Sequence, residues 1–248
     1  MPIGRVSAAL YIACLVAAGA IGQENPPTTI IKGGGGLASL TEQLKQHHVE
    51  LTEAGLLKAL RDTDAQVRYL AALRLAEVKD AAAVPAIEEA LEAEKVPETR
   101  MNITIALVQL GDEKGIVELT SDCKDPELPG YFRARAMLYM LPRGSKVCFK
   151  AALDLLSTDP DSRAQVVSLL PQYLGPSKEE SNEVLEATAK CLTDESPGVR
   201  IQAAYTLRTL ANPSAIPLLR SAIAAEPDDD VRSQMQYSLG HLEGGQHR

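Results

Sequence analysis

Apolar positions recur along the chain with a helical period, and this pattern is itself repeated. Apolar residues stand three and seven positions after each of six arginines, a spacing that places them on one face of a helix. A second apolar stretch begins 15 or 16 positions after the arginine, behind a residue type that can cap a helix. The spacing therefore predicts pairs of helices that repeat about every 32 residues. The six arginines are Arg68, Arg100, Arg133, Arg163, Arg200 and Arg232, and the predicted caps are Asp80, Asp112, Ser145 and Asn212.

A period of this length indicates an array in which each helical pair buries its apolar face against its neighbours. We expect an all-α fold, an α-solenoid of about six helical pairs over residues 37–243, with a capping helical pair at its N-terminus. The fourth repeat is longer, and Ser177 with Glu180 predicts a capping box that restarts its second helix. Residues 23–36 are expected to form a flexible linker, and residues 244–248 a short tail.

Residues 1–22 have the pattern of an export signal. Arg5 supplies a positive charge, an apolar run follows it, and Ala18 and Ala20 are small residues suited to cleavage. The run is short for a membrane span, so we expect cleavage soon after Ala20 and no stable membrane insertion afterwards. A retained anchor is the alternative. The expected location is the periplasm or the exterior of a bacterial cell.

Two stretches carry the clearest repeat motif. They are Asp64–Arg68, with the sequence DAQVR, and Ser196–Arg200, with the sequence SPGVR, and paired alanines follow each of them. Pro85 and Pro217 stand where the second helices open, a position at which proline is tolerated. These features resemble the short HEAT-like repeats of bacteria, which also occur in phycobilin lyase subunits. The resemblance implies an α-α superhelix, a ladder of aspartate–arginine contacts between adjacent repeats built on the six arginines, and the second helix of each pair on the concave side.

The charge of the chain limits its partners. The formal net charge is −8 and no cluster of lysine and arginine occurs in the sequence, so nucleic-acid binding is not expected. A curved helical array offers a surface far longer than a small substrate needs. We therefore expect a monomer that binds a protein partner presenting basic residues, on a concave face that includes Glu89, Glu118 and Asp154.

The residue types that carry chemistry have structural explanations. Cys123, Cys148 and Cys191 occupy apolar or small core positions of the repeat, so we expect reduced, buried thiols. The sequence contains no paired-cysteine metal motif and no serine-hydrolase, nucleotide-binding or zinc-protease motif, and no catalytic residue, metal or cofactor is expected. Two functions stay open. One is an exported scaffold for protein–protein interaction without a catalytic site; the other is a lyase-like enzyme or enzyme subunit that handles a tetrapyrrole or another cofactor.

Overall fold

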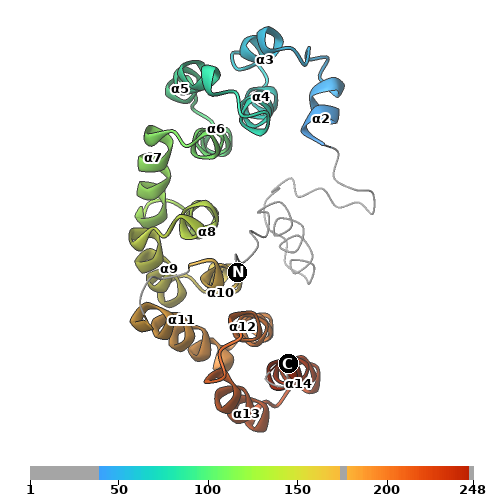
Figure 1. Ribbon diagram of the computed structural model, residues 1–248, viewed down its shortest axis with the longest axis vertical. Helices are drawn as coiled ribbons and strands as arrows, with labels where there is room; N and C mark the ends of the chain where they lie inside the picture. The colour runs from blue at the N-terminus through green and yellow to red at the C-terminus, as the bar shows by residue number, and fades with distance from the viewer. Residues whose placement is uncertain (1–38, 174–177, 246–248) are drawn as a thin grey trace, which may run out of the picture.

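The computed structural model describes residues 39–173 and 178–245, and the predicted signal peptide and linker lie outside this part of the chain. The regular elements within the described residues are all helices, which confirms the predicted all-α solenoid. The helices stand in two rows along an open arc (Figure 1). No helix among the described residues is both long and apolar enough to cross a membrane.

The two rows correspond to the two helices of the predicted pairs. A capping pair begins the array, formed by α2 (Leu40–Gln46) and α3 (Glu53–Ala59). The first helices are α4 (Ala65–Glu77), α6 (Pro97–Leu110), α8 (Gly130–Met140), α10 (Arg163–Leu169), α12 (Pro197–Leu210) and α14 (Asp229–Gly245). The second helices are α5 (Val84–Ala93), α7 (Glu113–Lys124), α9 (Lys146–Thr158), α11 (Lys178–Lys190) and α13 (Ala215–Ala225).

Most of the predicted caps stand at helix starts. Asp112 and Ser145 accept hydrogen bonds from backbone amides at the starts of α7 and α9, at 3.0 and 3.4 Å. Asp80 instead caps a short 3-10 turn that leads into α5, whose first turn contains Pro85. This arrangement lets the proline stand where its missing amide costs no hydrogen bond.

The first helices line the inner side of the arc, and the second helices with α3 form the outer side (Figure 1). The expectation that the second helices line the concave side is therefore wrong. The physical reason lies in residue size: the first helices bury paired alanines where they pack on their neighbours, as α4 does on α6 and α12 on α14. Small side chains let helix axes approach closely, so the array bends toward the row that contains them. The fully buried alanines include Ala71, Ala72, Ala203 and Ala204.

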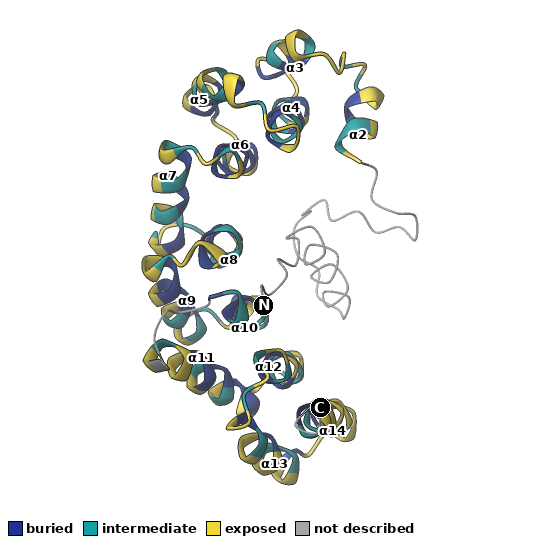
Figure 2. Ribbon diagram, in the orientation of Figure 1, coloured by how far each residue is buried: buried dark blue, intermediate teal, exposed yellow. Residues whose placement is uncertain are grey.

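The core runs between the two rows, where buried residues gather (Figure 2). It consists mainly of leucine, valine, isoleucine and alanine, in three adjoining clusters. The buried aromatic residues Phe132, Phe149 and Tyr173 belong to the middle cluster, where the rings of Phe149 and Tyr173 stack with centroids 4.1 Å apart. The aliphatic composition suits closely spaced helices, which leave little room for large rings.

A disulfide joins the outer helices α7 and α9. It links Cys123 at the end of α7 to Cys148 at the start of α9, with Cα atoms 5.2 Å apart and both side chains fully buried. The prediction of reduced thiols is wrong for these two residues, because the end of one second helix meets the start of the next across the repeat junction. Cys191 is a free, buried cysteine, as expected.

Candidate interaction surface

Three of the six arginines form ion pairs that cross from one repeat to the next. Arg68 donates from Nε and one terminal nitrogen to Glu94 at 2.7 and 3.0 Å, and Arg200 does the same to Glu226 at 2.7 and 2.8 Å. Arg163 pairs with Asp194 at 2.9 Å. In each case the carboxylate stands in the loop before the next first helix, so the pair fixes one repeat against its neighbour. Two of these partners are glutamates, where the family resemblance implied aspartate.

The electrostatics of these pairs depend on burial. The Glu226 side chain is only 2% exposed, and its hydrogen bonds with Arg200 hold its pKa below the ordinary value. Burial alone would raise the pKa of Glu94, but hydrogen bonds from Arg68 and from two backbone amides lower it. Both carboxylates are thus kept ionised by partners inside the fold.

The other three arginines pair differently. Arg100 binds Glu118 at 2.6 Å, Arg133 lies 3.5 Å from Asp154, and Arg232 pairs with Asp229 in its own helix. All six arginines nevertheless share one feature, a hydrogen bond to a backbone carbonyl near the end of the preceding outer helix or in the loop after it. Helix C-termini leave carbonyls without partners and favour cations, so the arginines complete the end of each preceding helix.

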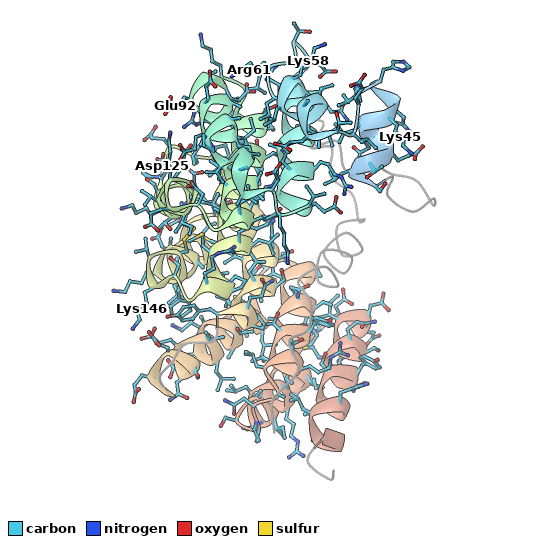
Figure 3. All side chains as sticks on the ribbon, turned by 45° about the horizontal axis from the view of Figure 1, so that its top comes forward. Lys45, Lys58, Arg61, Glu92, Asp125 and Lys146 are labelled. Carbon is cyan, nitrogen blue, oxygen red and sulfur yellow. A yellow bond between two sulfur atoms is a disulfide. The ribbon has the colours of Figure 1, made fainter. Side chains whose placement is uncertain are left out.

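The acidic residues expected on the concave face stand on the outer row. Glu89, Glu118 and Asp154 belong to α5, α7 and α9, and each has an arginine partner. Two of those partners are repeat arginines, and the third is the exposed Arg61, which lies 2.6 Å from Glu89. The three carboxylates therefore do not form an acidic concave surface. Charges of both signs alternate here, and Figure 3 shows side chains such as Arg61, Glu92 and Lys146 projecting from the molecule.

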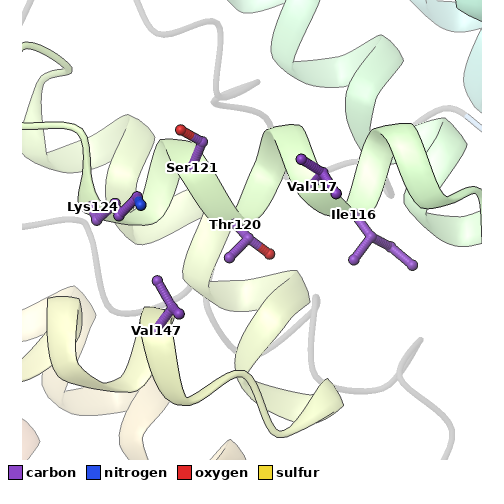
Figure 4. A pocket seen from close by; sticks show the side chains of 6 residues that line it. All are labelled: Ile116, Val117, Thr120, Ser121, Lys124 and Val147. Carbon is purple, nitrogen blue, oxygen red and sulfur yellow. The ribbon is translucent and has the colours of Figure 1, made fainter.

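The outer row carries a shallow apolar hollow of about 320 Å³ between α7 and α9. Val117 and Val147 face it, and Lys124 stands at one edge (Figure 4). Val117 is 60% exposed and Val147 is 43% exposed. The lining residues contain no carboxylate, histidine or thiol, and Lys124 is the one ionisable side chain among them.

A second, smaller hollow lies beside α6 and α7 and contains Arg100, Glu118 and Asp122. Burial raises the pKa of Asp122 to about 6, Glu118 adds to the increase, and Arg100 opposes it. Among the described residues, no group of three or more histidine, cysteine, aspartate or glutamate side chains is arranged to hold a metal ion. The raised pKa of Asp122 is explained first by its burial and then by the nearby negative charge of Glu118.

Tyrosines gather on the first helices around two arginines. Arg135 on α8 donates a hydrogen bond to the side-chain oxygen of Asn102 on α6. Burial raises the pKa of Tyr69 on α4 and of Tyr139 on α8, and the positive charge of Arg135 opposes both increases. We call this group, completed by the exposed Tyr131, the Arg135 cluster.

The Arg208 cluster lies further along the same row. The guanidinium of Arg208 lies over the ring of Tyr205 at 4.5 Å and over that of Tyr237 at 5.2 Å, and Tyr237 also contacts His241. The two tyrosines are 45% and 57% exposed. Arginine held over aromatic rings is favourable and keeps its N–H donors directed outward in one plane.

Sequence reasoning missed these clusters, although a signal was present. Tyr205 and Tyr237 each stand five positions after a repeat arginine. At 100° per residue, that position lies about 180° from the core positions three and seven. A tyrosine there faces away from the outer row, toward the inside of the arc. The low overall aromatic content concealed this concentration on one face.

A family model described as HEAT repeats matches residues 53–138 and 149–240 of the chain. No curated protein matches the sequence. Among solved structures, the CpcE–CpcF complex of phycocyanin lyase from Nostoc is 21% identical, with 89% of this chain and 81% of that chain covered and a TM-score of 0.49. Human deoxyhypusine hydroxylase is 21% identical over 77% of this chain and 73% of its own, with a TM-score of 0.42. An engineered protein is 22% identical over 77% of this chain and 96% of its own, with a TM-score of 0.44.

Proposed function

Since the chain belongs to the HEAT-repeat family, we propose that it is an exported, monomeric scaffold that binds another protein and has no catalytic site of its own. The observation that carries this proposal is the pair of tyrosine–arginine clusters on the inner row. Tyrosine and arginine are the residue types, together with tryptophan, that dominate the energetics of protein interfaces. We call the surface formed by Tyr69, Tyr131, Arg135, Tyr205, Arg208 and Tyr237 the inner face.

The dimensions of the inner face suit a polypeptide. Six first helices spaced about 8 to 10 Å apart give a surface about 40 to 50 Å long. A small ligand needs an enclosed cavity, and the two hollows described above are shallow and lie elsewhere. An extended protein segment can instead contact several repeats at once.

Two features support export. The disulfide between Cys123 and Cys148 is of the kind that persists in oxidising compartments such as the periplasm or the cell exterior. The sequence of residues 1–22 also has the composition of an export signal. On this proposal the protein isolated from its host begins near Ile21 or Gln23, and an intact-mass measurement checks it. Recovery of the full-length chain in the membrane fraction would instead indicate a retained anchor.

Site-specific photo-crosslinking in the native host tests the binding proposal. A photoreactive phenylalanine derivative replaces Tyr205 or Tyr237 in the full chain, and Val117 on the outer row serves as the control position. We expect a crosslinked protein from the two inner positions and none from Val117, since only the inner face is proposed to contact the partner. Crosslinks from Val117 alone would place the interaction on the outer row and refute the proposal.

A further inference from the structure

Carboxylates are fewer on the inner row than on the outer row. The six first helices contain five acidic residues, and three of them have arginine partners: Glu77 at 2.6 Å, Glu243 at 2.7 Å, and Asp229, which pairs with the repeat arginine Arg232. The other two, Glu98 and Asp230, stand in the first turns of α6 and α14. The outer helices α5, α7, α9 and α11 carry eleven acidic residues. The six first helices contain nine arginines against five carboxylates, so the inner row is net positive in a chain whose formal net charge is −8.

Two arginines of the inner face have no acidic partner among the described residues. Arg135 is bound to the amide of Asn102, and Arg208 lies over two tyrosine rings. One carboxylate, Glu98, approaches the Arg135 cluster, where it forms a hydrogen bond with Tyr131 rather than an ion pair with Arg135. Every repeat arginine, by contrast, has a carboxylate within 4 Å.

Held in place by neutral groups, these two arginines retain donors for an incoming anion. A guanidinium presents five N–H donors in a planar fork that matches a carboxylate. Asn102 and the tyrosine rings orient the side chains without neutralising their charge. Exposed rings beside the arginines add apolar contact area at small entropic cost, since a tyrosine has few rotatable bonds.

We infer that the inner face binds an extended, acidic polypeptide segment, with Arg135 and Arg208 as its two anchor points. This inference rests on the proposed scaffold function and reverses the partner charge expected from the sequence. The anchors stand on α8 and α12, two helix spacings or about 16 to 20 Å apart. An extended chain covers that distance in about five or six residues. The intervening helix α10 presents the exposed, uncharged Gln165 and so leaves the path open.

Nucleic acid is the less favoured anion. Strong phosphate-backbone binding requires many basic contacts. The six first helices contain no lysine within the described residues, and only Arg135 and Arg208 remain without acidic partners. Two separated guanidinium groups beside exposed rings fit a peptide with a few acidic side chains better than a continuous phosphate chain.

A selection from a displayed library of random peptides about 12 residues long tests the inference, because an extended peptide of that length spans both anchors. The full chain is compared with the double variant Arg135→Gln/Arg208→Gln. The matched control is Arg61→Gln/Arg220→Gln, which removes the same charge from sites 68% and 65% exposed outside the inner face. The single variant Arg208→Gln, at a partly exposed position, supplies a second test should the double variant lose its fold, which circular dichroism reports.

We expect the wild-type chain to enrich peptides rich in aspartate and glutamate. The enriched peptide should bind the inner-face double variant about 100-fold more weakly, since two charge-assisted contacts are lost. Binding to the control variant should stay within about threefold, because distant exposed charges are screened.

Enrichment of neutral or basic peptides, or no enrichment, overturns the inference, as does equal loss of binding in the control variant. Displacement of the enriched peptide by single-stranded DNA at equal concentration also overturns it and points to nucleic acid. If crosslinks from Tyr205 or Tyr237 still capture a protein in these cases, the scaffold function stands and only the acidic partner is wrong. If the crosslinks fail as well, both proposals fall.

Discussion

The buried pair between Arg200 and Glu226 gives the sharpest test of how the repeats are joined. Arg200 is 12% exposed and makes two hydrogen bonds to Glu226 and two to backbone carbonyls of the preceding loop. The change Arg200→Ala removes all four and leaves a buried carboxylate without its cation. Breaking a buried ion pair in this way costs about 3 to 5 kcal/mol. We expect a cost at the lower end, about 3 kcal/mol, because the smaller alanine side chain lets water reach and hydrate the carboxylate of Glu226.

The control is Arg61→Ala, which breaks a pair of similar length between side chains that are 68% and 64% exposed. An exposed pair contributes about 0.5 kcal/mol. In a domain of this size, about 2 to 4 °C of melting temperature corresponds to each kcal/mol, so we expect decreases of about 9 °C and about 1 °C. Hydrogen exchange should localise the larger effect to α14, because repeat arrays lose stability at the weakened junction.

The pH dependence provides a second signature of the same pair. The folded-state pKa of Glu226 is held low, so its contribution to stability is present above the ordinary glutamate pKa and is lost as the pH falls through the folded value. The difference between wild type and Arg200→Ala should therefore shrink below about pH 4. Adding Glu226→Gln to Arg200→Ala should restore part of the stability. Equal melting temperatures for the Arg200 and Arg61 variants would refute the reasoning.

Three further predictions follow from the core and its junctions. Replacing Cys123 and Cys148 by serine opens a loop with a sequence separation of 25 and should lower the free energy of unfolding by about 3.5 kcal/mol, measured by denaturant titration with a reductant-treated wild type as comparison. Burial raises the pKa of Asp122 to about 6, so the folded state binds this proton more tightly than the unfolded state does. The free energy of unfolding should therefore fall as the pH rises from about 4 to 6. The variant Asp122→Asn should lose this pH dependence, which melting temperatures measured across that pH range would show. Gly130→Ala places a methyl group 1.6 Å from a carboxylate oxygen of Asp159 and should lower the free energy of unfolding by about 1 to 3 kcal/mol. Gly240→Ala meets nothing within 4 Å and should raise the free energy of unfolding by about 0.5 to 1 kcal/mol. Equal melting temperatures for the two variants would contradict this prediction.

The sequence by itself determined the helices and their pairing. The signals that define a helix involve residues close together in the sequence, so they can be recognised without knowing the fold. They are the helical period, caps such as Asp112 and Ser145, and proline in a first turn. The recurring arginine likewise marked a repeat because each copy serves the same local purpose, the completion of the preceding helix end. These features predicted the solenoid.

The tertiary structure alone decided how the repeats face one another. The side toward which the array bends depends on the distances between successive helices, which small buried alanines set across repeat junctions. The same relation between repeats brought Cys123 to Cys148 and joined Arg68 to Glu94 and Arg200 to Glu226. The tyrosine–arginine clusters also combine residues from separate repeats. Such contacts form between residues that are distant in the sequence, and whether they form depends on the angle between neighbouring repeats. No local sequence pattern specifies that angle.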